Sequence, residues 1–214
     1  MTRQEILKNA KPILFNTEMV RAILDGRKTV TRRVIKHNVD AILNSPYHNE
    51  HPEVEDKQII RKLCMPPYQP GDILYVRETW GEGYEEGSYI YKADDKLANL
   101  PEFKESSKLI YHTSIHMPKE AARVFLKVTN VRVERLKDMT DKDALKEGAQ
   151  GVKCDHAGLG AYGCTDCMNT GWLEPPMLEF MEIWNSTIKK SDLYCYGWDA
   201  NPWVWVIEFE RIEV

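Results

Sequence analysis

Residues 23–33 read ILDGRKTVTRR, and the pattern of side chains changes in the middle of this stretch. Apolar residues recur at helical spacing before the change, after Asn16-Thr17, a pair that can cap a helix. Asp25-Gly26 ends this predicted helix, because glycine accepts the left-handed conformation that closes a helix. The β-branched residues that follow favour an extended chain. The stretch therefore predicts a helix, a turn and a strand in succession.

Alternating and β-branched runs predict further strands on both sides of this stretch. Two other helices have recognisable starts, since Thr140 with Asp143 imitates a capping box and Pro175-Pro176 can begin a helix. Residues 122–136 are expected to hold two strands that pair or bend near Thr129-Asn130. The other predicted strands occupy residues 11–15, 70–80, 88–93 and 203–214, and the two helices about 140–148 and 176–188. Short strands with a few helices predict a mixed α+β fold, mainly β and barrel-like.

The organisation along the chain predicts one domain over residues 1–214 that carries two insertions. Residues 38–69 lose the periodicity and accumulate polar, His and Pro residues, which is typical of a surface insertion. Residues 150–173 form a second insertion rich in Cys, His and Gly. No internal repeat or low-complexity tract interrupts the rest.

Composition excludes several classes of protein. Hydrophobic residues make up 43% of the 214 residues and charged residues 29%, the balance of an ordinary globular domain. No apolar run approaches the roughly 20 residues that a membrane span needs. The first residues lack a long apolar core followed by a cleavage site, so no secretion signal is predicted. We therefore expect a cytoplasmic protein with no membrane partner.

The net charge of −4 hides a local excess of positive charge. Residues 1–37 contain nine Lys or Arg and three acidic residues. A basic patch on an acidic protein can hold an anionic ligand locally without making the whole chain a polyanion binder. The alternative is a basic face that is simply solvated.

Four strings of the sequence, taken in their order along the chain, form a recognisable set. They are ILDGRKTVTRR (23–33), QPGDILYVRETW (69–80), LKVTNVRVERLKDMTDKDALKEGA (126–149) and WVIEFERI (205–212). With these strings the chain resembles the ASCH domain family, and in particular its larger members typical of bacteriophages and prophages. The resemblance covers most of the chain in pieces and implies a PUA-like pseudo-barrel fold.

The resemblance implies binding of RNA or of a modified nucleoside. Some small bacterial members of the family are amidohydrolases that remove the acetyl group from N(4)-acetylcytidine with a lysine, a threonine and a glutamate. Lys28 and Thr31 match the first two, and Glu147 is the best match to the third, with Asp143 as the alternative. If the protein is an enzyme, which the sequence does not decide, it is a hydrolase acting on a non-peptide C–N amide bond.

These residue types suit hydrolysis of an amide. The Thr31 hydroxyl can act as nucleophile and the Lys28 amine as its base, an alternative to histidine-based triads. Glu147 can accept a hydrogen bond from the substrate or help to protonate the leaving group. Residues three apart in a strand point to opposite faces, so Lys28 and Thr31 converge only if residues 26–29 form a turn. Otherwise Lys28 is an exposed cation and Thr31 a strand-forming residue.

Ligand binding requires cations and an aromatic surface. Arginines can hold a phosphate or a carbonyl group, and a base can stack on an aromatic ring. Trp80 ends a predicted strand and is the better candidate for a pocket wall, whereas at least one of Trp203 and Trp205 belongs to the core. The predicted ligand-binding residues are Arg27, Arg32, Arg33, Arg77 and Trp80.

Four of the possible metal ligands fall close together in the second insertion. Cys154, His156, Cys164 and Cys167 predict a closed tetrahedral zinc site with a structural role. Ordinary reduced thiols and a redox Cys-x-x-Cys pair are the alternatives. The sequence contains no motif for an organic cofactor.

A function of another class fits the same features. The chain can be a non-catalytic phage or prophage protein-interaction module whose insertions form the contact surfaces, with protein partners that the sequence does not identify. Binding of RNA weakens steeply with salt, whereas such a module shows no comparable dependence.

Overall fold

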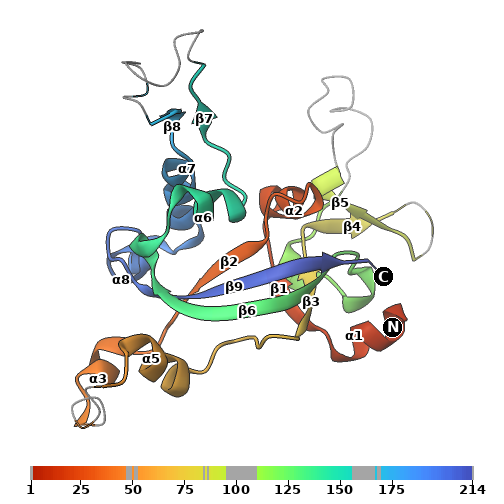
Figure 1. Ribbon diagram of the computed structural model, residues 1–214. Helices are drawn as coiled ribbons and strands as arrows, with labels where there is room; N and C mark the ends of the chain where they lie inside the picture. The colour runs from red at the N-terminus through yellow and green to blue at the C-terminus, as the bar shows by residue number, and fades with distance from the viewer. Residues whose placement is uncertain are drawn as a thin grey trace. The chain divides into compact units, whose positions relative to one another are not determined.

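The computed structural model describes residues 2–46, 50, 53–83, 85, 87–94, 110–155, 167 and 170–213 (Figure 1). The chain divides into two compact units, each built from segments that are distant in the sequence. The first unit comprises Met1–Thr29, Gln69–Thr129 and Phe209–Val214, and the second comprises Val30–Tyr68 and Asn130–Glu208. The domain boundary thus falls between the turn and the strand of the stretch at residues 23–33.

The first unit combines short helices with strands. Two long strands, β6 and β9, cross between the units along the chain, so each unit holds one part of both. The elements of this unit are α1 (Arg3–Asn9), β1 (Lys11–Leu14), α2 (Thr17–Leu24), β3 (Ile73–Arg77), β4 (Trp80–Glu82), β5 (Tyr89–Tyr91), the 3-10 turns η1 (Lys92–Asp94), η3 (Ser114–His116) and η4 (Lys119–Ala121), and the beginning of β6 (Phe125–Arg135).

The second unit places helices after its first strand and again near its end. Helices α6 and α7 lie side by side in it (Figure 1). Its elements are β2 (Val30–Val34), α3 (Val39–Leu43), α5 (Asp56–Cys64), η5 (Leu136–Asp138), α6 (Asp141–Lys146), β7 (Val152–Lys153), β8 (Trp172–Glu174), α7 (Pro176–Thr187), η6 (Lys190–Asp192), α8 (Leu193–Tyr196) and the beginning of β9 (Trp203–Ile212).

Five strands form the principal sheet in the order β1-β3-β6-β9-β2. In the first unit β1 runs parallel to β3, and β3 is antiparallel to β6. In the second unit β2 is antiparallel to β9, with Val30 opposite Glu208 and Val34 opposite Val204. The mixed α+β prediction is confirmed. Because β1 and β2 are the two edges, the strand pairings among the described residues leave the sheet open and do not close it into the barrel-like form that the sequence predicts.

Each unit has an apolar core of its own. In the first, residues of α1, β3 and η4 pack around Phe125 and Trp80. In the second, Val30 of β2 packs with Val204 and Val206 of β9 against Phe180 and Trp184 of α7. The apolar face of β2 therefore turns toward α7.

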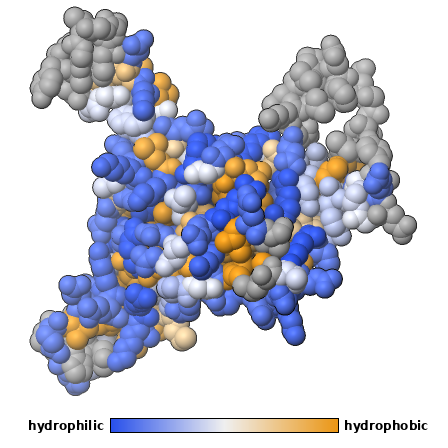
Figure 2. Space-filling model, turned by 45° about the vertical axis from the view of Figure 1, so that its right-hand side comes forward, coloured by the Kyte–Doolittle hydropathy of each residue, from blue (hydrophilic) through white to orange (hydrophobic). Residues whose placement is uncertain are grey.

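The surface is mixed in character. Hydrophilic residues predominate on the face drawn in Figure 2, and hydrophobic residues gather there in separate patches. Among the helices that the structure describes, none has the length and apolar character needed to cross a bilayer.

Replacement of Leu136 by alanine tests the core of the second unit. Leu136 is fully buried in that core, so Leu136→Ala is expected to lower the free energy of unfolding by about 2–5 kcal/mol. The matched control is Leu178→Ala in α7, because the Leu178 side chain is 50% exposed, and its cost is expected to stay within about 0.5 kcal/mol. Urea denaturation measures the free energy of unfolding of both variants. Equal losses in the two variants would contradict the placement of Leu136 in this core.

Candidate functional site

The turn that follows α2 is formed as the sequence predicts. Asp25 ends the helix and Gly26 has a φ of +73°, a backbone conformation that glycine adopts without strain. The backbone N–H groups of Arg27 and Lys28 both donate to the carbonyl of Ala22 at 2.9 Å. The backbone therefore turns back on the helix before β2 begins.

Lys28 is buried in the first unit. Only 2% of the residue is exposed. Its Nζ lies 5.6 Å from the centre of the Phe15 ring, which favours a cation over the face of the ring. A long charged side chain is rarely buried to this extent, so the exposed cation considered from the sequence is not what the structure contains.

Thr31 and Arg32 are consecutive residues of β2 and are both buried. Thr31 stands opposite Ile207 of β9, and Arg32 stands opposite Val206. Successive side chains of a strand point to opposite faces. Arg32 therefore shares the face of Val30, toward the core with α7, and Thr31 and Arg33 share the other face.

Glu147 is the residue that ends α6. Its N–H donates to the carbonyl of Asp143 at 3.0 Å, and the residue is 7% exposed. The helix begins with the predicted capping box, because Thr140 and Asp143 bond each other reciprocally. Burial raises the pKa of Asp143, but the hydrogen bonds from Thr140 and the charges of Arg32 and Lys146 together hold that pKa below its ordinary value. Asp143 thus caps the helix, and Glu147 is the buried one of the two candidates.

The Glu147 carboxylate faces Arg32. Arg32 Nη1 lies 3.1 Å from Glu147 Oε1, and Nη2 lies 3.5 Å from Glu134 Oε2. The Arg32 side chain is 0% exposed and that of Glu147 is 4% exposed. Because a buried charge is tolerated only when it is paired and hydrogen-bonded, the two residues depend on each other.

The pair continues into a longer ion network. Arg132 Nε donates to Glu134 at 2.6 Å, and its Nη1 bonds Glu208. Desolvation lowers the pKa of Arg132, but Glu134 and Glu208 together raise it above its ordinary value. Positive and negative groups therefore alternate from Glu147 through Arg32 and Glu134 to Arg132.

This arrangement bears on the role predicted for Arg32. Its two terminal nitrogens are directed to carboxylates of the protein, and Arg32 Nε is buried without a hydrogen-bond partner among the described residues. The contacts of Arg32 are those of a residue that holds Glu147, rather than of an arginine exposed to a phosphate.

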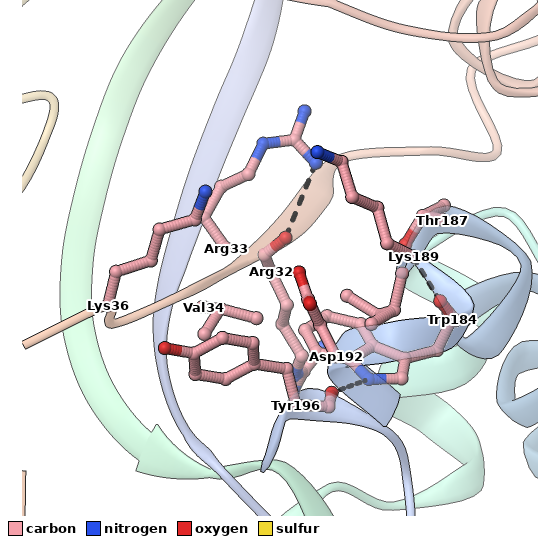
Figure 3. Close-up of a pocket in the computed structure, with 10 residues that line it drawn as sticks. Arg32, Arg33, Val34, Lys36, Trp184, Thr187, Lys189, Asp192 and Tyr196 are labelled. Carbon is pink, nitrogen blue, oxygen red and sulfur yellow. Dashed lines mark hydrogen bonds between the residues drawn. The ribbon is translucent and has the colours of Figure 1, made fainter. Parts of the chain in front are cut away.

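A cavity of about 380 Å³ opens beside Arg33 in the second unit (Figure 3). We call it the strand-end cavity, because it lies where β2 ends. Figure 3 shows the charged groups of Arg33, Lys36 and Lys189 gathered on one side of it, with Asp192 and Tyr196 across from them. Its lining residues are Arg32, Arg33, Val34, Lys36, Trp184, Thr187, Ile188, Lys189, Asp192 and Tyr196.

The walls of this cavity are held by internal bonds. Trp184 Nε1 donates to the carbonyl of Tyr196 at 2.9 Å, which ties α7 to α8. Arg33 Nη1 bonds the carbonyl of Arg32. Desolvation lowers the pKa of Arg33, whereas Glu147 and Tyr68 raise it. An arginine remains a cation at neutral pH even so.

The strand-end cavity contains residues that the sequence did not single out. Lys189, Trp184 and Tyr196 come from segments more than 140 residues after β2 in the chain. The Lys189-Lys190 pair just beyond a predicted helix was the available signal, but its position relative to Arg33 depends on the packing of α7 against β2.

The other predicted ligand-binding residues belong to the first unit. Arg27 Nη2 bonds Asp25 at 3.1 Å. Arg77 donates to the carbonyl of Met117 at 3.0 Å and to that of Ile115. Trp80 is 8% exposed and lies in the core. Their roles in ligand binding stay predictions.

Glu78 is a further buried carboxylate in the first unit. It is 1% exposed and receives two hydrogen bonds from Arg123, at 2.9 and 3.0 Å. Burial raises the pKa of Glu78, and the opposing effect of Arg123 is smaller. Arg123 also stacks on the Tyr91 ring at 3.9 Å. The first unit therefore has its own enclosed ion pair.

The structure describes two of the four predicted zinc ligands. His156 and Cys164 lie outside the described residues, whereas Cys154 and Cys167 lie within them. In the part of the chain that is described, no three His, Cys, Asp or Glu side chains are grouped so as to hold a metal ion. The zinc site stays a prediction.

Comparison of the chain with protein-family models, with curated proteins and with solved structures finds no match. The family resemblance therefore rests on the four sequence strings.

Replacement of Arg32 tests the buried ion network. Arg32→Ala removes the guanidinium that pairs with the buried Glu147 carboxylate, and the expected loss in the free energy of unfolding is about 3–5 kcal/mol. The control is Arg61→Ala on the exposed face of α5, with an expected change within about 0.5 kcal/mol. Thermal and urea denaturation measure both. If Arg32→Ala were as stable as the control, the network would not support the fold.

Proposed function

We propose that this protein is an ASCH-family, PUA-like protein whose second unit binds RNA or a modified nucleoside in the strand-end cavity. The observation that carries this proposal is the convergence of three cations, Arg33, Lys36 and Lys189, on a cavity with aromatic walls. The protein as a whole is acidic, with a net charge of −4, so this concentration of positive charge is local.

The size of the cavity supports a ligand of this class. Small-molecule sites are typically clefts of about 300–1,000 Å³, and the strand-end cavity has about 380 Å³. Trp184 and Ile188 supply apolar surface for a base. The cations supply charge-assisted hydrogen bonds to phosphate oxygens. Base and phosphate thus have complementary surfaces in one cavity.

Binding of cytidine monophosphate and of a short single-stranded RNA tests this proposal. The triple variant Arg33→Ala, Lys36→Ala, Lys189→Ala is expected to weaken binding by about tenfold or more, because each removed cation gives up a charge-assisted contact. Lys142→Ala is the matched control, since Lys142 is exposed in α6 and lines none of the cavities described. Calorimetry and fluorescence anisotropy measure the dissociation constants.

Salt dependence separates the two classes of function. The logarithm of the association constant for the RNA is expected to fall with the logarithm of salt concentration, with a slope of about 0.7 per phosphate contacted. No binding of either ligand by the parent protein would reject the proposal and favour the protein-interaction module.

A second candidate function is hydrolysis of an acylated nucleoside such as N(4)-acetylcytidine. One observation favours it: Lys28, Thr31 and Glu147 are three of the five polar or charged residues that are buried in the described chain, the others being Arg32 and Glu78. Burying such groups costs free energy. Their burial is the observation that keeps the catalytic assignment as a candidate.

In this reaction the Thr31 hydroxyl would attack the acetyl carbonyl and give up its proton to a base. The C–N bond would then break, and the leaving amine would take up a proton from water. A second water molecule would hydrolyse the resulting acetyl ester, which releases acetate and restores the hydroxyl group.

Incubation with N(4)-acetylcytidine tests this second function. Release of cytidine and acetate, followed by chromatography, is expected from the parent protein and from Lys142→Ala. Lys28→Ala and Thr31→Val are each expected to lower the rate by at least about 100-fold, the usual contribution of acid–base help. Absence of turnover by the parent protein, or an unchanged rate in Lys28→Ala, would exclude the catalytic assignment while leaving nucleoside binding open.

A further inference from the structure

Two more hollows adjoin the strand-end cavity in the second unit. The Tyr68 hollow, of about 310 Å³, is lined by Arg33, Lys36, His37, Tyr68 and Trp205 among others. The Arg135 hollow, of about 560 Å³, is lined by Lys36, His37, Arg135, Tyr194, Tyr196 and Trp203 among others. Both continue from the end of β2.

Shared lining residues connect the strand-end cavity, the Tyr68 hollow and the Arg135 hollow. Lys36 lines all of them. Arg33 lines both the strand-end cavity and the Tyr68 hollow. Tyr196 lines both the strand-end cavity and the Arg135 hollow. A ligand confined to one hollow leaves the others unused, whereas a chain-like ligand passing Lys36 can enter all three.

Each of these hollows is lined by a tyrosine that is at least partly exposed. Tyr196 lines the strand-end cavity, and Tyr68 lines the hollow named after it. Tyr194, which is 83% exposed, lines the Arg135 hollow. The tryptophans Trp184, Trp203 and Trp205 are largely buried and form walls. Aromatic rings that are open to solvent are the surfaces on which unpaired bases stack.

Positive charge also runs through all three hollows. Five Arg or Lys residues line them, namely Arg32, Arg33, Lys36, Arg135 and Lys189. Only two acidic residues do so in the described lining, Asp40 and Asp192. Arg32 is matched by Glu147, but the surplus remains. A charged ligand with a repeated negative group fits this distribution.

The Arg135 hollow has fixed donors. The Arg135 guanidinium lies 4.3 Å from the centre of the Trp203 ring and donates to the carbonyl of Asn201 at 3.1 Å. Trp203 Nε1 is buried and has no hydrogen-bond partner among the described residues. A ligand that enters this hollow therefore meets a cation whose orientation is fixed by the Trp203 ring and the Asn201 carbonyl.

We propose that the three hollows form one binding track for a single-stranded oligonucleotide, whose backbone passes Lys36 while successive bases enter the hollows. This inference rests on the proposed function and specifies its substrate class. A duplex keeps its bases paired and stacked inside the helix, so it cannot offer them to separate tyrosines. RNA and DNA strands share the phosphate and base chemistry that these residues recognise, and the experiment separates them.

A length series tests the track. Cytidine monophosphate and fluorescein-labelled oligocytidylates of two, four and eight nucleotides are titrated against the full chain. The affinity is expected to rise by at least about tenfold from one to four nucleotides and to level off after that, because each further base that stacks adds to binding. A duplex of the same length is expected to bind at least about tenfold more weakly than the single strand. Deoxycytidylates run in parallel identify the preferred sugar.

Variants in the Arg135 hollow show whether this hollow contributes to oligonucleotide binding. Tyr194→Ala and Arg135→Ala are each expected to weaken tetranucleotide binding by about fivefold or more and to leave mononucleotide binding within twofold. Tyr194 is largely exposed, so its replacement separates loss of the track from loss of the fold. Lys142→Ala is the control and is expected to bind every length as the parent does.

The outcomes distinguish the two proposals. Equal affinity for one and eight nucleotides, or a tetranucleotide affinity that Tyr194→Ala leaves unchanged, would overturn the track and leave the strand-end cavity as a nucleoside site. Duplex binding as tight as single-strand binding would also overturn it. No binding at any length would overturn the proposed function itself.

Discussion

A buried arginine in an edge strand is the constraint on which the second unit depends. The guanidinium of Arg32 is withdrawn from water, and an unpaired charge in that position would cost several kcal/mol. Glu147 at the end of α6 and Glu134 on β6 supply the opposing charges. Since each carboxylate is itself largely enclosed, the pairing fixes where α6 ends relative to β2. The capping box at the start of α6 then fixes the other end of the helix.

Because side chains alternate along a strand, Arg32 and Arg33 have different roles. The guanidinium of Arg32 pairs with Glu147 toward the core, whereas Arg33, next in the chain, leaves β2 from the opposite face, and its side chain lines both the strand-end cavity and the Tyr68 hollow. Lys36 and Lys189 add their charges to that of Arg33. Two adjacent arginines of one basic stretch thus have different environments.

The first unit uses buried charge in a comparable way. Glu78 and Arg123 form an enclosed pair there, and Tyr91 covers the guanidinium. Lys28 is buried beside Phe15. Both units therefore keep charged groups in their interiors, where packing sets their positions. The proposed binding uses other groups, the cations that line the strand-end cavity.

The amino-acid sequence by itself determined the local features of this protein. Gly26 predicted the turn after α2, and Thr140 with Asp143 predicted the start of α6, because such signals depend on residues within a few positions of each other. Only the tertiary structure decided that Arg32 meets Glu147, 115 positions away in the chain, and that Lys189 joins Arg33. It also left the sheet open and put Trp80 in a core. These outcomes follow from how distant segments pack, and no local pattern of side chains specifies which distant partner a residue will find.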